Sequence, residues 1–164
     1  MGSDFTLKRI FAYANTRNAV KKVLFVCTRN SARSQMAEAL LNHQCGEFFK
    51  AKSAGFVAGT LNPLAVEAMA EVGIDISGNE TKSVFDLYRA GELFAYVIGV
   101  CDQTTMEKCP TFPAPVERLN WSFRDPASVS GSYHSQMQQM RDVRDLIREG
   151  IDEWCSKVCC LETA

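Results

Sequence analysis

The chain has 164 residues, of which 46% are hydrophobic and 23% charged, a composition typical of one globular domain. Its formal net charge is −1 with no basic block, and no apolar run approaches the roughly 20 residues of a membrane span, so we expect neither nucleic acid nor a membrane as partner. Seven cysteines, an odd number in a chain with no evident export signal, argue against a disulfide framework and favour reduced thiols in the cytoplasm.

Apolar periodicity predicts an N-terminal extension over residues 1–20, expected to be helical, and a domain over residues 21–160 in which strands alternate with helices. The strands are expected over residues 22–26, 48–53, 94–100 and 117–121. The helices of the domain are expected over residues 33–46, 63–72, 84–90 and 135–158. Asn62 with Pro63 marks the start of one of these helices, and Gly73 marks its end.

Near-continuous apolar strands separated by helices indicate a parallel sheet that is covered on both faces. We therefore predict an α/β fold, a single three-layer domain with a four-stranded parallel sheet and helices on both faces. Ligands of such sheets bind at the carboxyl ends of the strands. Cys27 and Cys101 each end a predicted strand, so the two thiols can meet at one site.

The first predicted strand leads into a polar loop and a helix start, an arrangement that favours binding of a tetrahedral oxyanion. Successive backbone N–H groups can turn inward as an anion nest, and the guanidinium of Arg33 fits two oxyanion oxygens at once. The same surroundings stabilise a thiolate, so Cys27 is the expected nucleophile. The residues predicted to form this site are Cys27, Thr28, Arg29, Asn30, Ser31, Ala32, Arg33 and Ser34.

Three residues of the loop carry more detailed expectations. The loop contains no glycine, and Asn30 is the best candidate for the positive φ that a tight anion nest usually requires. Ser34 either donates a hydrogen bond to the thiolate or caps the following helix. Arg29 either strengthens the local positive field or points to solvent, and we slightly favour solvent.

Later segments of the chain extend the pattern that begins in the loop. They are Gln35 to Glu38, Ser53 to Gly55, Gly73 to Ser77, Val100 to Asp102, Cys109-Pro110 and Trp121 to Ala127. Together with the loop they resemble the low-molecular-weight tyrosine phosphatase superfamily, and more narrowly its thioredoxin-coupled arsenate reductases. The resemblance covers about residues 22–155.

The resemblance implies an enzyme that reduces arsenate without a cofactor, in a loop that also accepts phosphate or sulfate. In such an enzyme Cys27 attacks arsenate, Arg33 binds the anion and Asp125, held extended by the following proline, protonates the departing oxygen. Cys101 then attacks the sulfur of Cys27 and releases arsenite. Cys109 attacks Cys101 in turn and leaves a disulfide for thioredoxin to reduce.

A low-molecular-weight tyrosine phosphatase is the alternative function. Such an enzyme needs only one cysteine, because water hydrolyses its phosphocysteine, and Tyr133 could accompany a phosphotyrosine ring. Ala127 and Ser128 follow Asp125-Pro126 in place of an aromatic pair, which favours a small inorganic substrate. A third interpretation is a non-enzymatic arsenic or redox sensor that uses the same loop only to hold an anion.

Some reductases of this family bind potassium beside the loop. Asn30 and Glu38 match two residues of that site, and Thr81 is a candidate for a third. Ser83 stands where an aspartate is expected, so we predict no metal.

Four further cysteines have no place in the resemblance: Cys45, Cys155, Cys159 and Cys160. Cys155 and Cys159 lie one helical turn apart, and no nearby histidine completes the four ligands that zinc usually takes. We expect them to be half-buried residues of the last helix, and a metal or accessory redox role stays open. Cys45 is expected to be a core residue at a helix end.

Overall fold

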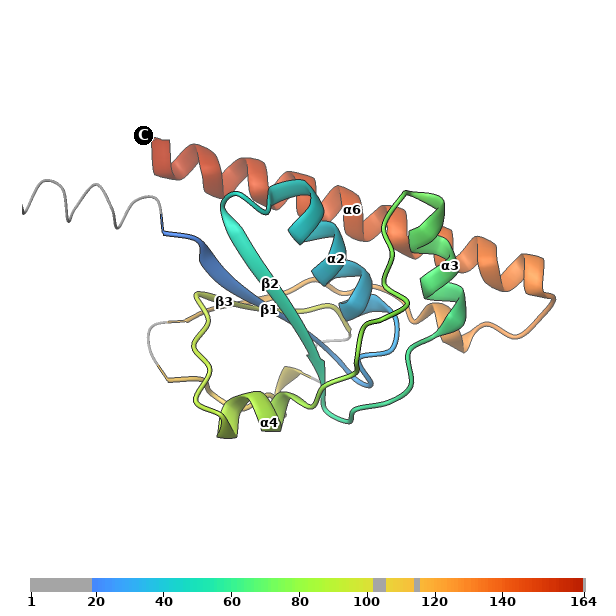
Figure 1. The fold of residues 1–164 in the computed structure, drawn as a ribbon, viewed down its shortest axis with the longest axis horizontal. Helices are drawn as coiled ribbons and strands as arrows, with labels where there is room; N and C mark the ends of the chain where they lie inside the picture. The colour runs from blue at the N-terminus through green and yellow to red at the C-terminus, as the bar shows by residue number, and fades with distance from the viewer. Residues whose placement is uncertain (1–18, 102–105, 114–115, 164) are drawn as a thin grey trace, which may run out of the picture.

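The structure is a computed structural model that describes residues 19–101, 106–113 and 116–163 (Figure 1). The predicted helical extension over residues 1–20 lies almost entirely outside the described residues, so it stays a prediction. Within the described part of the chain, no helix is both long enough and apolar enough to cross a membrane.

Four parallel strands form the sheet in the order β2-β1-β3-β4, which confirms the predicted fold class. The strands are β1 (Lys21–Cys27), β2 (Phe49–Gly55), β3 (Tyr96–Gly99) and β4 (Glu117–Asn120). In the register of the sheet, Val26 of β1 lies opposite Ala54 of β2 and Gly99 of β3. Because the strands run in the same direction, their carboxyl ends, including Cys27, meet at one edge of the sheet.

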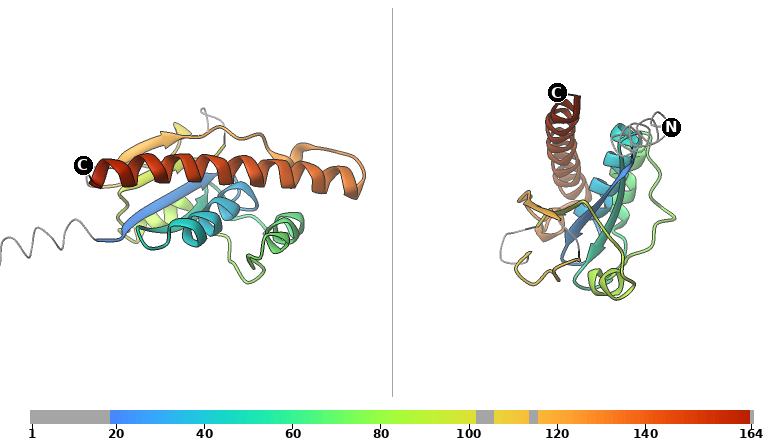
Figure 2. Two further views of the ribbon diagram at one scale, coloured as in Figure 1. Left: turned by 90° about the horizontal axis from the view of Figure 1, so that it is seen from above. Right: turned by 90° about the vertical axis from the view of Figure 1, so that its left-hand side faces the viewer.

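Helices cover both faces of the sheet, as predicted. They are α2 (Arg33–Cys45), α3 (Pro63–Glu71), α4 (Val84–Arg89), the short 3-10 helix η1 (Pro126–Ser128) and α6 (Tyr133–Thr163). Alternate residues of β1 point to opposite faces, so that Phe25 packs with α2, α3 and α6, whereas Leu24 packs with α4. Accordingly, α6 runs along one side of the strands and α4 lies on the other (Figure 2).

The bounds of β3 and α6 differ most from the predicted ones. Phe94 and Val100 are buried, but the ladder between β1 and β3 ends before it reaches either residue. The apolar run over residues 94–100 therefore indicates which residues are buried, and the buried stretch is longer than the stretch that pairs with β1. By contrast, the predicted start and end signals of α3 are confirmed. The Asn62 side chain accepts a hydrogen bond from the N–H of Leu64, and Gly73 has a φ of 80°.

Candidate active site

The loop between β1 and α2 borders a cleft of about 660 Å³. The cleft is lined by Cys27, Thr28, Arg29, Ser31, Ala32, Arg33, Gly59, Thr60, Leu61, Asn62, Pro63, Asp125 and Ala127. Asn30 and Ser34 do not line it, because both are buried behind the loop. The structure thus gathers most of the predicted site residues around one cavity at the carboxyl edge of the sheet.

The thiol of Cys27 has two hydrogen-bonding neighbours inside the loop. The backbone N–H of Asn30 donates to Cys27 Sγ at 3.1 Å, and Ser34 Oγ lies 2.8 Å from the same sulfur. Because Ser34 Oγ already accepts a hydrogen bond from Asn30 Nδ2 at 2.8 Å, its own proton is available for the sulfur. The N-terminus of α2 has no side-chain cap, so the hydrogen-bonding of Ser34 fits the thiolate alternative better than the cap.

Asn30 fixes the shape of the loop. Its φ is 54°, which confirms the predicted left-handed conformation, and its side chain is fully buried. The amide Nδ2 donates to Ser34 Oγ and Ser53 Oγ, while Oδ1 accepts hydrogen bonds from Gln35 Nε2 and from the backbone N–H of Lys82. One side chain therefore joins β2, the start of α2 and the segment before α4 behind the anion loop.

Arg33 and Asp125 both line the cleft. The guanidinium Nη1 of Arg33 donates to the carbonyl oxygen of Phe123 at 3.0 Å, which holds the side chain while its other N–H groups stay available for an anion. The Asp125 carboxylate accepts a hydrogen bond from the N–H of Ala127 and so caps η1. The backbone of Asp125 is extended, as expected for a residue that precedes proline.

Cys101 and Cys109 are both buried thiols, and they occupy different parts of the core. Cys101 follows β3, belongs to the same core cluster as Cys27, and has its Sγ 4.0 Å from the carbonyl oxygen of Val26. Cys109 belongs to the cluster on the opposite face of the sheet. Burial raises the pKa of the Cys109 thiol above its ordinary value, Arg118 lowers it in part, and Cys101 raises it further.

A buried polar network behind the loop was not predicted from the sequence. Gln35 Nε2 donates to both oxygen atoms of Asn30 and to the carbonyl oxygen of Glu80, and Asn79 Nδ2 donates to Gln35 Oε1. A signal was present, because Gln35 is a polar residue within a helical segment whose neighbours Met36 and Ala37 are apolar. Fully buried glutamine needs partners, so its position predicts such a network.

The side chains that match a potassium site bond to other protein groups in the structure. The carboxylate of Glu38 accepts a hydrogen bond from Ser53 Oγ, and the ammonium of Lys82 lies 3.9 Å from Glu38 Oε2. Thr81 Oγ1 donates to the carbonyl oxygen of Gly59, and the Ser83 side chain caps α4. Nowhere in the described residues do three or more histidine, cysteine, aspartate or glutamate side chains converge to hold a metal ion.

Comparisons with known proteins agree with this site. Residues 22–160 match the family model described as low molecular weight phosphotyrosine protein phosphatase. An arsenate reductase of Bacillus subtilis (strain 168) is 40% identical over 136 residues, which are 82% of this chain and 94% of that protein. An arsenate reductase of Shouchella clausii is 41% identical over 128 residues, 77% of this chain and 89% of that protein.

Solved structures give the same picture. A structure described as an arsenate reductase in the oxidized state has a TM-score of 0.71 at 28% identity and covers 85% of this chain and 99% of its own. The thioredoxin-dependent arsenate reductase of Corynebacterium glutamicum has a TM-score of 0.60 at 28% identity and covers 93% of this chain and 71% of its own. By the family match and by these relatives, the chain belongs to the low molecular weight phosphotyrosine protein phosphatase family.

Proposed function

We propose that the chain is an arsenate reductase in which Cys27, Cys101 and Cys109 pass a disulfide along the core and thioredoxin reduces it. The observation that carries this proposal is the pairing of Cys27, hydrogen-bonded in the anion loop, with Cys101, a second thiol at the end of the adjacent strand and in the same core cluster. A hydrolase has no use for the second thiol, whereas a two-electron reduction requires one.

The first step forms a sulfur–arsenic bond. Arsenate lies on the loop N–H groups and the Arg33 guanidinium, and the Cys27 thiolate attacks arsenic(V). Asp125 lines the same cleft as Cys27 and donates a proton to the departing oxygen, which leaves as water.

The next two steps are thiol–disulfide chemistry. The Cys101 thiolate attacks Cys27 Sγ, the new S–S bond forms, and the electron pair of the sulfur–arsenic bond passes to arsenic, which leaves as arsenite. Cys109 then attacks Cys101, frees Cys27 and leaves a Cys101–Cys109 disulfide. The dithiol of thioredoxin reduces that disulfide, and a relay of this kind needs the reducing thiol pool of the cytoplasm.

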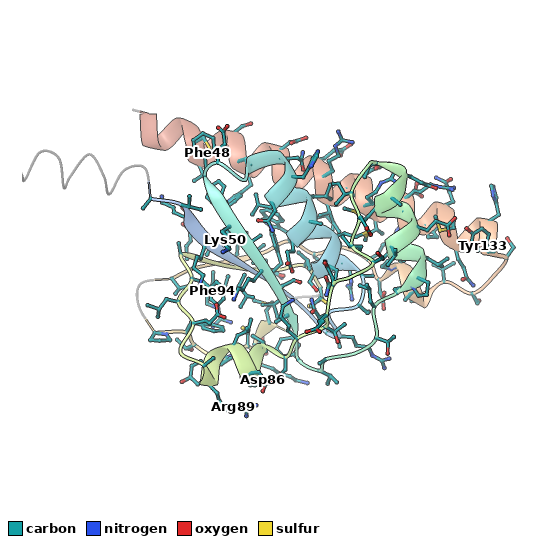
Figure 3. All side chains as sticks on the ribbon, viewed as in Figure 1. Phe48, Lys50, Asp86, Arg89, Phe94 and Tyr133 are labelled. Carbon is teal, nitrogen blue, oxygen red and sulfur yellow. The ribbon has the colours of Figure 1, made fainter. Side chains whose placement is uncertain are left out.

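The composition of the cleft favours a small inorganic anion over a phosphotyrosine side chain. Its described lining contains no aromatic ring. Tyr133, the residue that kept the phosphatase alternative open, lies at the start of α6, where its hydroxyl donates to the Glu67 carboxylate (Figure 3). A sensor that only holds an anion would have no need of the Asp125 carboxylate, which repels an anion unless it is protonated.

The proposal is tested by coupling arsenate reduction to thioredoxin. With thioredoxin, thioredoxin reductase and NADPH, the chain is expected to oxidise one NADPH for each arsenite formed. Phosphate in place of arsenate should give no oxidation, since it binds the same loop but has no accessible two-electron reduction. Hydrolysis of an aryl phosphate without any arsenate-dependent NADPH oxidation would instead establish the phosphatase.

Gly55→Ala is expected to displace the anion loop. A Cβ at Gly55 would lie 2.6 Å from the Asn30 nitrogen and 2.7 Å from the Arg29 carbonyl carbon, both backbone atoms that hold the loop in place. The loop must move to relieve these close contacts, and the displacement should lower kcat/KM for arsenate by roughly 100-fold. Gly78→Ala is the matched control, because a Cβ there meets nothing within 4 Å, and equal kcat/KM values for the two variants would contradict the account.

The final step of the relay is expected to accelerate as the pH rises. Burial raises the pKa of Cys109, so little thiolate is present at neutral pH, and its fraction grows about tenfold per pH unit below that pKa. The rate of Cys101–Cys109 disulfide formation, measured by rapid quenching and alkylation, should follow this fraction.

Arg118 provides the control for the pH dependence. Its positive charge lowers the pKa of Cys109, and its Nη2 donates to the carbonyl oxygen of Met106 in the same segment. Arg118→Gln should therefore move the pH profile to higher pH, and Arg118→Lys should move it less. Unchanged profiles in both variants would show that another group limits this step.

A further inference from the structure

A second group of thiols lies where the end of α2 meets α6, outside the cleft. Cys45 is the last residue of α2, and Cys155 and Cys159 lie one turn apart on α6. Cys155 is a buried member of the core cluster that also holds Cys27, and the partly buried Cys45 and Cys159 pack against that cluster. The sequence placed these cysteines on two separate predicted helices, and the fold brings them together.

The contacts between the two helices place Cys45 beside Cys155. The side-chain amide of Gln44, the residue before Cys45, donates to the carboxylate of Asp152, which precedes Cys155 by one turn.

The surroundings of Cys155 keep its thiol neutral. Burial raises the pKa of Cys155 far above its ordinary value, and the hydrogen-bonded Cys45 thiol, Cys159 and Asp152 raise it further. Such a place suits a divalent cation poorly, because a zinc ion is usually held by four ligands and binds thiols only in their deprotonated form. A neutral electrophile that forms covalent bonds to two thiols leaves no charge in the core.

We propose that Cys45 and Cys155 form a dithiol site that binds trivalent arsenic. Arsenous acid exchanges two hydroxyl groups for the two sulfurs, As(OH)₃ + 2 RSH → (RS)₂AsOH + 2 H₂O, so that two As–S bonds form, two waters leave and no electron is transferred. Soft thiol ligands suit this soft, thiophilic centre. The choice of trivalent arsenic as the bound group rests on the proposed function, because the product of that reaction is arsenite. The binding itself requires no turnover.

The site is tested in the full-length chain with Cys27, Cys101 and Cys109 replaced by serine, so that the relay thiols cannot bind the probe. The probe is phenylarsine oxide, which has two exchangeable positions and therefore selects a pair of thiols. Intact-mass measurement should show one probe per chain. Binding should weaken about 100-fold in Cys45→Ala and in Cys155→Ala, since each loses the chelate. Cys159→Ala is the matched control on the same helix and should keep the affinity.

A thermal measurement separates loss of binding from loss of folding. The probe should raise the Tm of the parent protein and of Cys159→Ala, and it should leave the Tm of a folded Cys45→Ala unchanged. Undiminished binding in Cys45→Ala, or loss of binding in Cys159→Ala alone, would overturn the assignment. Arsenate turnover of the wild-type chain is measured separately, so failure of the dithiol site and failure of the proposed reductase give different results.

Discussion

Replacing Cys27 with serine is expected to lower kcat/KM for arsenate by roughly 10⁴-fold or more. A serine hydroxyl is not ionised at neutral pH, and oxygen cannot form the disulfide that the relay requires. The variant should still bind phosphate, because the backbone N–H groups of the loop and the Arg33 guanidinium do not depend on the thiol. Kinetic assays and calorimetric titration with inorganic phosphate measure the two properties.

The pairing of these two measurements makes the prediction specific. Loss of turnover with retained phosphate binding identifies Cys27 as the nucleophile. Substantial turnover in Cys27→Ser would contradict the assignment. Loss of phosphate binding together with turnover would show that the thiol, whose sulfur accepts the N–H of Asn30, is needed to hold the loop.

Replacing Cys101 or Cys109 with serine is expected to stop the relay at two different points. Without Cys101, nothing attacks the Cys27–arsenic adduct, so no arsenite should form even in a single turnover. Without Cys109, one arsenite per chain should form and leave a Cys27–Cys101 disulfide, after which the enzyme stops. Both variants should lose thioredoxin-coupled turnover to the background rate.

Hydrolysis of an aryl phosphate provides the control for both variants. That reaction needs the loop, Cys27 and Asp125 but neither of the other two cysteines. Any such activity of the wild-type chain should therefore survive in both variants, within about threefold if the loop is undisturbed. If either variant completed multiple arsenite turnovers, the cysteine that it lacks would not be part of the relay.

Much of the fold follows from local patterns in the sequence. The alternation of apolar strands and helices predicts the parallel sheet, and the structure confirms it, because strands buried on both faces such as β1 read as continuous apolar runs. Asn62 marks the start of α3 through its side-chain cap, with Pro63 at the first helical position, and Gly73 marks the end through its positive φ.

The parts of the site that the sequence did not predict depend on contacts between distant segments. Gln35 bonds to Asn79 and to the carbonyl oxygen of Glu80, and a helical pattern does not reveal partners more than forty residues away. The burial of Cys109 on the opposite face from Cys27 could not be read from a proline-bearing segment without periodicity. The approach of Cys45 to α6 likewise depends on how the two helices pack.

The most direct test of the relay is a single turnover without thioredoxin. Reduced enzyme is mixed with arsenate, quenched and alkylated, and its disulfides are identified by peptide mass mapping while arsenite is quantified. We predict one arsenite per chain, an equal amount of Cys101–Cys109 disulfide, and Cys27 recovered as a thiol. Arsenite formed with all three thiols still reduced, or a disulfide that excludes Cys101, would contradict it.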